Sequence, residues 1–142
     1  MNAAARPKSY WLIAVIALLW NLLGVLVFLL TIAMTPEQAA AMPDAQREVY
    51  EATPSWINVL WGAAVAAGVL GAFGLLLRKR WAVMLFMVSL VMVVLQIVGS
   101  FAATPAWSLL GPSSLVMPAV ILLIALGLWL YAKKADARGW LG

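Results

Sequence analysis

Residues 74–85, GLLLRKRWAVML, decide the fold of this chain. Three consecutive basic residues, Arg78, Lys79 and Arg80, separate two long apolar runs, residues 56–77 and 81–101. A charged side chain at the centre of a membrane costs about 2.5–3.5 kcal/mol on an insertion scale. The two runs therefore cannot form one continuous span. We expect a tight antiparallel hairpin with the basic triplet among the lipid headgroups.

Two further apolar runs, residues 10–34 and 115–132, flank this hairpin. Each of the four runs is long enough to cross a bilayer as a helix, which needs roughly 17–25 residues. The chain of 142 residues is 66% hydrophobic and 10% charged, whereas a soluble domain is about 45–50% apolar and about 25% charged. The sequence therefore predicts an all-α membrane protein, with residues 1–142 forming a single domain, an up-down bundle of four transmembrane helices.

The first run could instead be a cleaved signal peptide, since Arg6 and Lys8 precede it. The apolar part of a signal peptide extends over roughly 7–15 residues, and residues 10–33 exceed that length. We expect the run to be retained as the first span.

The basic residues predict the orientation. All but one of the nine Lys and Arg residues fall at the chain ends or in the triplet, and Arg47 is alone among four acids in the remaining loops. Basic residues in short loops mark the cytoplasmic face. We therefore expect a multi-pass protein of a bacterial inner membrane with both termini in the cytoplasm. The basic end consists of Arg6, Lys8, Arg78, Lys79, Arg80, Lys133, Lys134 and Arg138.

The loop after the first span carries helix signals. The run Thr35-Pro36-Glu37-Gln38 is typical of a capping box with proline at the first helical position. Residues 44–52 place Ala45, Val49 and Ala52 on one face and charged side chains on the other. We expect a short amphipathic helix on the periplasmic surface that caps the bundle; a lid over a ligand is the alternative.

The second outer loop, residues 102–114, contains Trp107 and the breaker Gly111-Pro112. We expect it to dip back into the membrane interface and Pro118 to fall in the first turns of the fourth span, where a missing N–H is tolerated. If the span begins earlier, at Pro112, Pro118 would instead kink it. Most tryptophans lie near predicted span ends, as membrane anchors do. Trp140 is expected on a tail along the inner surface, and Trp20 alone lies at mid-depth.

Two amides lie inside the spans, Asn21 in the first and Gln96 in the third. Lipid cannot satisfy them, so each should face protein. Because each belongs to a stripe of small and polar residues, we expect the two stripes to meet and the amides to bridge the helices, a contact worth roughly 0.6–2 kcal/mol. The alternative is a small polar pocket that opens outward, lined by Asn21, Gln96, Trp20, Asn58 and Ser100. On the second span, Ala64, Ala67, Gly71 and Gly74 form a smooth face for close packing.

The absent residue types restrict the chemistry. The chain has no cysteine and no histidine, which excludes thiolate catalysis, Cys/His metal sites and His-ligated haem. The five carboxylates lie outside the four runs, so no span carries an ionisable relay of the kind that proton-coupled carriers use. We expect no catalytic residues, no cofactor and no metal, and hence no enzyme.

Several stretches resemble a known group of proteins: YWLI and LWNLLG within residues 10–24, MTPEQ at 34–38, TPSW at 53–56 and LLLRKRWA at 75–82. The group comprises small bacterial inner-membrane proteins of about this length, essentially uncharacterised, some of which are loosely labelled "sugar transporter". The resemblance implies a four-span fold in a bacterial envelope. It assigns no role to any residue.

The leading functional hypothesis is a non-enzymatic accessory or structural protein that binds lipid, a protein partner or a second copy of itself. The first alternative is a module that binds or transports a small, possibly sugar-like solute at the Asn21/Gln96 region. The second is a protein that binds anionic lipid through Arg78, Lys79 and Arg80, at about 1 kcal/mol per residue. Nucleic acid is not expected, because the basic clusters are short and tied to span ends.

Overall fold

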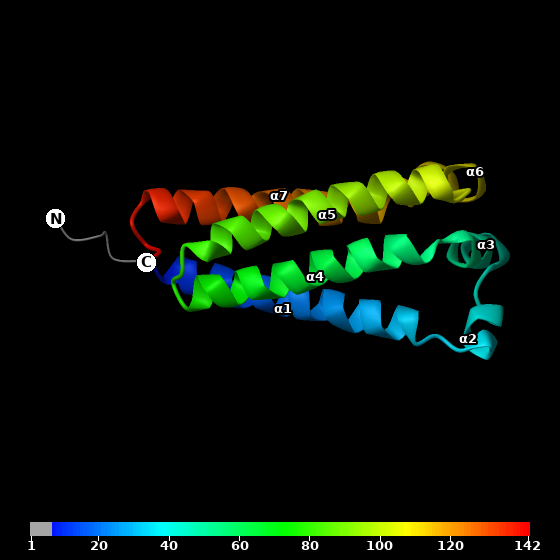
Figure 1. The fold of residues 1–142 in the computed structure, drawn as a ribbon, viewed down its shortest axis with the longest axis horizontal. Coiled ribbons are helices and arrows are strands. Elements are labelled where there is room, and N and C mark those ends of the chain that lie inside the picture. Colours follow the sequence, from blue (N-terminus) through cyan, green and yellow to red (C-terminus); the bar gives the residue numbers. More distant parts are fainter. Residues whose placement is uncertain (1–6) are drawn as a thin grey trace.

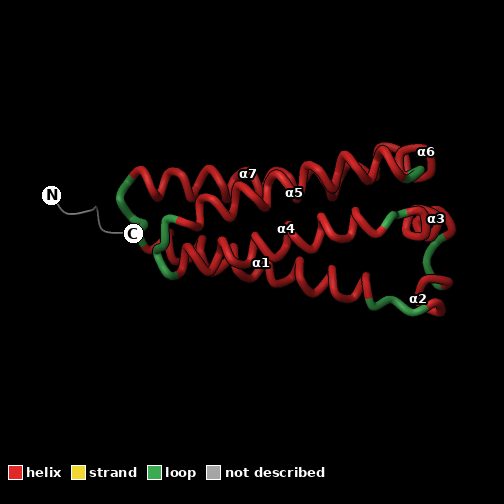
Figure 2. Tube along the Cα trace, in the orientation of Figure 1, coloured by secondary structure: helices red, strands yellow, loops and turns green. Residues whose placement is uncertain are grey.

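The computed structural model describes residues 7–142, and this part of the chain contains helices and no strand (Figure 2). Arg6, counted above with the basic end, lies outside it. The α-helices are α1 (Lys8–Ile32), α2 (Pro36–Ala40), α3 (Asp44–Ala52), α4 (Ser55–Leu76), α5 (Trp81–Ala103), α6 (Ala106–Leu110) and α7 (Val116–Ala137). A 3₁₀ helix, Gly111–Leu115, leads directly into α7.

Four segments are long and apolar enough to cross a membrane: α1, α4, α5 and the stretch Ala106–Ala137. The four predicted spans are thus confirmed as helices, with shifted ends. The fourth differs most, because α7 continues past Ala132 to Ala137. The apolar run stops at Lys133, but lysine and alanine are good helix formers, and the chain turns only at Gly139, whose φ is 75°.

The long helices pack in sequence order. α4 packs against α1 and α5, and α5 packs against both α4 and α7. α1 and α7 share no extended contact among the described helices. Figure 1 shows α1 and α4 on one side of the molecule and α5 and α7 on the other. The four helices therefore form an open array rather than a closed ring.

Small residues bring α4 and α5 together. Gly71 lies against the ring of Phe86, and a Cβ at Gly74 would come within 2.8 Å of the Cβ of Ala82. The smooth face expected on this helix is buried. In lipid, close packing of this kind is a main source of affinity between helices.

The basic triplet forms the predicted tight turn between α4 and α5. Arg78 adopts a left-handed conformation with φ of 60°. Its N–H donates to the carbonyl of Leu75, and the N–H of Lys79 donates to the carbonyl of Gly74 at 2.8 Å. This pair of bonds is the Schellman motif, which satisfies carbonyls at a helix end.

The chain after α7 folds back onto that turn. The N–H of Gly142 donates to the carbonyl of Arg78, and the N–H of Arg80 donates to the carbonyl of Gly142. The guanidinium of Arg80 lies 2.9 Å from a carboxylate oxygen of Asp136. Trp140 was expected as an anchor on a tail along the inner membrane surface; instead the residue is only 6% exposed. The reversal at Gly139 directs the indole back among the helices.

An aromatic cluster closes this end of the array. Tyr10 of α1 is fully buried, and its hydroxyl donates to the carbonyl of Leu75 in α4. Its ring centroid lies 6.3 Å from that of Tyr131 in α7 and 5.9 Å from that of Trp140. The cluster therefore joins α1 and α7 at the end where Figure 1 places the C-terminus.

The opposite end carries α2, α3 and α6 (Figure 1). The predicted capping box of Thr35 and Gln38 is present, and the helix expected over residues 44–52 is α3. The guanidinium of Arg47 donates to the carbonyls of Ala40 and Met42, so it fixes the turn between α2 and α3. We define this end by α3 and call it the α3 end.

The second outer loop folds as α6 and the 3₁₀ helix, and α6 packs against α3. The side chain of Trp107 on α6 is 53% exposed. Pro118 is the third residue of α7, so it lies in the first turn as predicted and removes no intrahelical hydrogen bond.

Candidate functional site

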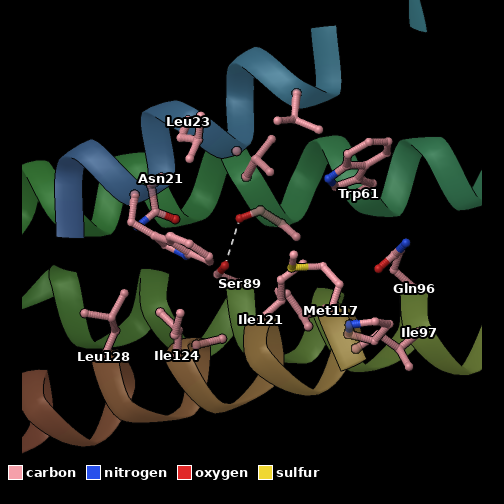
Figure 3. Close-up of a pocket in the computed structure, with 18 of the residues that line it drawn as sticks. Asn21, Leu23, Trp61, Ser89, Gln96, Ile97, Met117, Ile121, Ile124 and Leu128 are labelled. Carbon is pink, nitrogen blue, oxygen red and sulfur yellow. Dashed lines mark hydrogen bonds between the residues drawn. The ribbon is translucent and has the colours of Figure 1, made fainter. Parts of the chain in front are cut away.

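A cavity of about 410 Å³ lies between α1 and α7, with α4 and α5 forming its back wall (Figure 3). It exists because α1 and α7 meet at the aromatic cluster but do not pack together beyond it. All four long helices contribute side chains. The lining includes Leu23 and Val27 of α1, Trp61 and Val65 of α4, Val93 and Ile97 of α5, and Ile121, Ile124, Ala125 and Leu128 of α7. We call it the lateral cavity.

The lateral cavity is mainly apolar, with a few polar groups along its walls. These come from Trp20, Asn21, Trp61, Ser89, Gln96 and Ser100. No residue that lines it carries a charge. Pockets for small molecules commonly combine an apolar lining with a few placed polar groups.

Asn21 projects from α1 close to α4. Its amide nitrogen donates to the carbonyl of Ala17, one turn earlier in the same helix, at 2.7 Å. A Cβ at Gly68 of α4 would collide with the side-chain oxygen of Asn21. The absence of a side chain at Gly68 is therefore what allows the amide to lie between the two helices.

Ser89 joins α5 to α4 behind the cavity. Its hydroxyl donates to the carbonyl of Ala64 at 2.8 Å (Figure 3). The side chain is 7% exposed, so the bond is shielded from solvent. This bond holds the back wall together at mid-depth.

The predicted bridge between Asn21 and Gln96 is absent. Asn21 bonds within its own helix, and Gln96 makes no side-chain hydrogen bond to the residues that the structure describes. In Figure 3 the two amides lie toward opposite ends of the cavity. The bridge does not form because α1 and α5 make no extended contact, and because Asn21 lies at the depth of Ser89, both side chains approaching Gly68, whereas Gln96 lies two turns farther along α5.

The other predicted pocket residues fall into two adjoining cavities. Trp20, Asn21, Gln96 and Ser100 line the lateral cavity. Asn58 does not; it lines a smaller cavity of about 130 Å³ at the α3 end, which also includes Gln96 and Ser100. We call this second space the outer cavity.

Sequence reasoning missed several residues of both cavities. Trp61, interpreted as a membrane anchor, lines both cavities, and its ring centroid lies 5.1 Å from that of Phe28. Thr31, Tyr50 and Thr53 line the outer cavity. Tyr50 carried no signal for this position, because adjacent residues of a helix do not share a face and the apolar face of α3 is that of Val49.

The basic end presents unpaired charge. Arg78 and Lys79 are exposed, and neither forms an ion pair with the residues that the structure describes. Arg80 differs, since it pairs with Asp136. Lys133 lies over the ring of Trp129, 4.6 Å from its centroid. The part of the chain that the structure describes holds no cluster of acids, histidines or cysteines able to bind a metal ion.

Comparisons with protein-family models, curated proteins and solved structures found no match. The resemblance noted from the sequence therefore stays a prediction, and function has to be argued from the cavities and charges themselves.

Proposed function

We propose that this chain is a non-enzymatic, multi-pass protein of a bacterial inner membrane that binds an apolar or amphiphilic molecule taken from the bilayer. The lateral cavity carries this proposal. Its volume of about 410 Å³ falls within the range of roughly 300–1,000 Å³ for ligand pockets. It lies along apolar helices, so a ligand dissolved in the membrane reaches it sideways, between α1 and α7.

The proposed topology is an up-down bundle with both termini in the cytoplasm. It rests on the basic residues gathered at one end, from Arg78–Arg80 to Lys133 and Lys134, under the rule that such residues stay inside. The α3 end then faces the periplasm, and α3 lies at that surface. We expect the basic end to make transient contact with anionic headgroups whichever leaflet it faces.

The lining favours a lipid-like ligand over a sugar. A sugar carries many hydroxyl groups, and each needs a hydrogen-bond partner once it leaves water. The lateral cavity offers few: two amides, two serines and the indole N–H groups of Trp20 and Trp61. Its lining contains no acid, base or nucleophilic thiol, so binding rather than catalysis fits its chemistry.

Filling the cavity tests this function. Ala125 lines the lateral cavity, whereas Ala119 of the same helix is exposed and does not. We expect the purified wild type and Ala119→Phe to retain a co-purified membrane lipid in native mass spectrometry. Ala125→Phe should lose it, because the ring occupies the space. Equal retention of the lipid by all three proteins would refute the proposal. The proposal would also fall if the wild type carried no lipid and Ala125→Phe instead abolished a dimer, because the cavity would then be an interface between two copies of the chain.

A second candidate function is binding of anionic lipid at the basic end, favoured by Arg78 and Lys79, which are exposed and form no ion pair within residues 7–142. Each such residue contributes about 1 kcal/mol near an anionic surface. Replacing both by Gln should weaken retention of phosphatidylglycerol and leave the lipid in the lateral cavity unchanged. Unchanged retention of phosphatidylglycerol in native mass spectrometry would exclude this second role.

A further inference from the structure

The lateral cavity and the outer cavity are adjacent. The two share Trp61, Gln96 and Ser100, so the walls that separate them are no thicker than these side chains. Asn58 lies in the first turn of α4, and Tyr50 and Thr53 precede that helix. The outer cavity therefore sits where the spans end, at the depth of lipid headgroups, and the lateral cavity extends from it toward mid-membrane.

The outer cavity differs from the lateral cavity in its polar groups. The hydroxyl of Thr31 donates to the carbonyl of Val27 in α1, and that of Thr53, directly after α3, donates to the carbonyl of Val49. By contrast, the amides of Asn58 and Gln96 and the hydroxyl of Tyr50 make no hydrogen bond to the residues that the structure describes. Amides and hydroxyls both donate and accept. These three side chains can therefore bind a ligand that has hydroxyl or carbonyl groups.

The outer cavity holds no charged side chain. The nearest cation along the chain is Arg47, on the same helix as Tyr50. It already pairs with Asp44 at 2.6 Å and lies 3.7 Å from Glu51. An anionic headgroup would therefore lose its hydration without gaining an unpaired cation, which is costly. An uncharged headgroup has no such penalty.

The dimensions suit one chain and a small head. The outer cavity of about 130 Å³ equals the volume of roughly four water molecules at about 30 Å³ each, which is the scale of a glycerol group. Along α5, the lateral cavity extends from Phe86 to Phe101, or about 22 Å at 1.5 Å per residue. That length accommodates an extended segment of hydrocarbon parallel to the helices.

We infer that the two cavities together hold one neutral acylglycerol. Its hydroxyl-bearing head lies among Tyr50, Asn58 and Gln96, and its acyl chain lies along the lateral cavity between α1 and α7. This inference rests on the proposed function and adds the class of ligand and its orientation, with the head at the α3 end.

The test compares two probes with the same chain, monopalmitoylglycerol and palmitoyl lysophosphatidic acid, by binding to the purified wild type in native mass spectrometry. We expect the neutral probe to bind roughly tenfold more tightly. Asn58→Leu, in the outer cavity alone, should remove that preference and keep chain binding. Tyr50→Phe, which deletes one hydroxyl, should reduce the preference for the neutral probe severalfold. Gln46→Leu, on the exposed side of α3, should change nothing.

The outcomes separate this inference from the proposed function. If Ala125→Phe abolishes binding of both probes but the wild type shows no preference between them, the headgroup assignment is wrong and the cavity function stands. If the preference survives both Asn58→Leu and Tyr50→Phe, the headgroup lies elsewhere and the inference falls. If Ala125→Phe binds both probes as the wild type does, the proposed function and the inference fail together.

Discussion

Gly68 of α4 and Asn21 of α1 form a matched pair: the glycine has no side chain at the one place where a Cβ would overlap the asparagine's side-chain oxygen. Asn21 lines the lateral cavity, and its contact with Gly68 is one of several between α1 and α4, since Gly62 lies against Phe28 and Gly24 against Val65. Since α1 has no extended contact with α7, its position depends on its packing against α4 and on the aromatic cluster.

Gly68→Ala should destabilise the protein by about 1–3 kcal/mol, the range for overpacking. Alanine is the better helix former by about 1 kcal/mol, so a loss of stability identifies a steric cause. Thermal unfolding in detergent measures it. Gly127→Ala is the control, because a Cβ there meets nothing within 4 Å, and it should be neutral or stabilising.

The same contact predicts coupling between the two positions. Asn21→Ala removes the amide that a Cβ at position 68 would strike. The double variant should therefore be more stable than the sum of the single changes predicts. Strict additivity in this double-mutant cycle would show that the two residues do not interact.

Ser89→Ala should cost about 0.6 kcal/mol, the average measured for hydrogen bonds between membrane helices. The change deletes the bond to the carbonyl of Ala64 that joins α5 to α4. Ser108→Ala, on an exposed residue, should leave the unfolding temperature unchanged. Equal effects at the two positions would show that the bond behind the cavity contributes nothing.

Trp140→Ala should cost about 3 kcal/mol or more, as large-to-small changes at buried aromatic residues do. Its ring packs against Tyr10 within the cluster that holds α1 to α7. Trp107→Ala is the matched control, since its side chain is 53% exposed. Comparable melting temperatures for the two variants would place Trp140 on the surface, as sequence reasoning alone suggested.

Arg78→Gly should stabilise the protein by about 1 kcal/mol. Arg78 occupies a left-handed position with φ of 60°, where a Cβ costs energy and glycine does not. Lys79→Gly, one residue along, removes the same charge without that relief and should be neutral or destabilising. A lower unfolding temperature for Arg78→Gly than for Lys79→Gly would contradict the Schellman geometry of this turn.

Local signals in the sequence predicted much of the fold. The triplet at Arg78 divides two spans because charge is excluded from lipid, and the capping box at Thr35 starts α2 by itself. Trp140 was misplaced because its burial depends on the reversal at Gly139, and a glycine near the end of a chain does not reveal which way the chain turns.

The site was less predictable, since it depends on which helices become neighbours. Four of the five residues predicted for a polar pocket do line the lateral cavity, because stripes of small and polar residues avoid lipid. The prediction of a direct contact between Asn21 and Gln96 was wrong, because a stripe of small and polar residues does not show which helix it will pack against. The hydrogen bond from Ser89 could not be predicted either, because its acceptor is the backbone carbonyl of Ala64 and every residue has such a carbonyl.

The space between α1 and α7 should open to the bilayer, and spin-label accessibility tests this opening most directly. The chain has no cysteine, so a single cysteine on α7 gives a unique label at Ala125 in the cavity, at Leu123, which is 67% exposed, or at Ala132, which is fully buried. We predict that in nanodiscs the label at Ala125 collides with oxygen nearly as often as the label at Leu123, and rarely with a water-soluble nickel chelate. Oxygen collisions at Ala125 as rare as those at Ala132 would contradict the account.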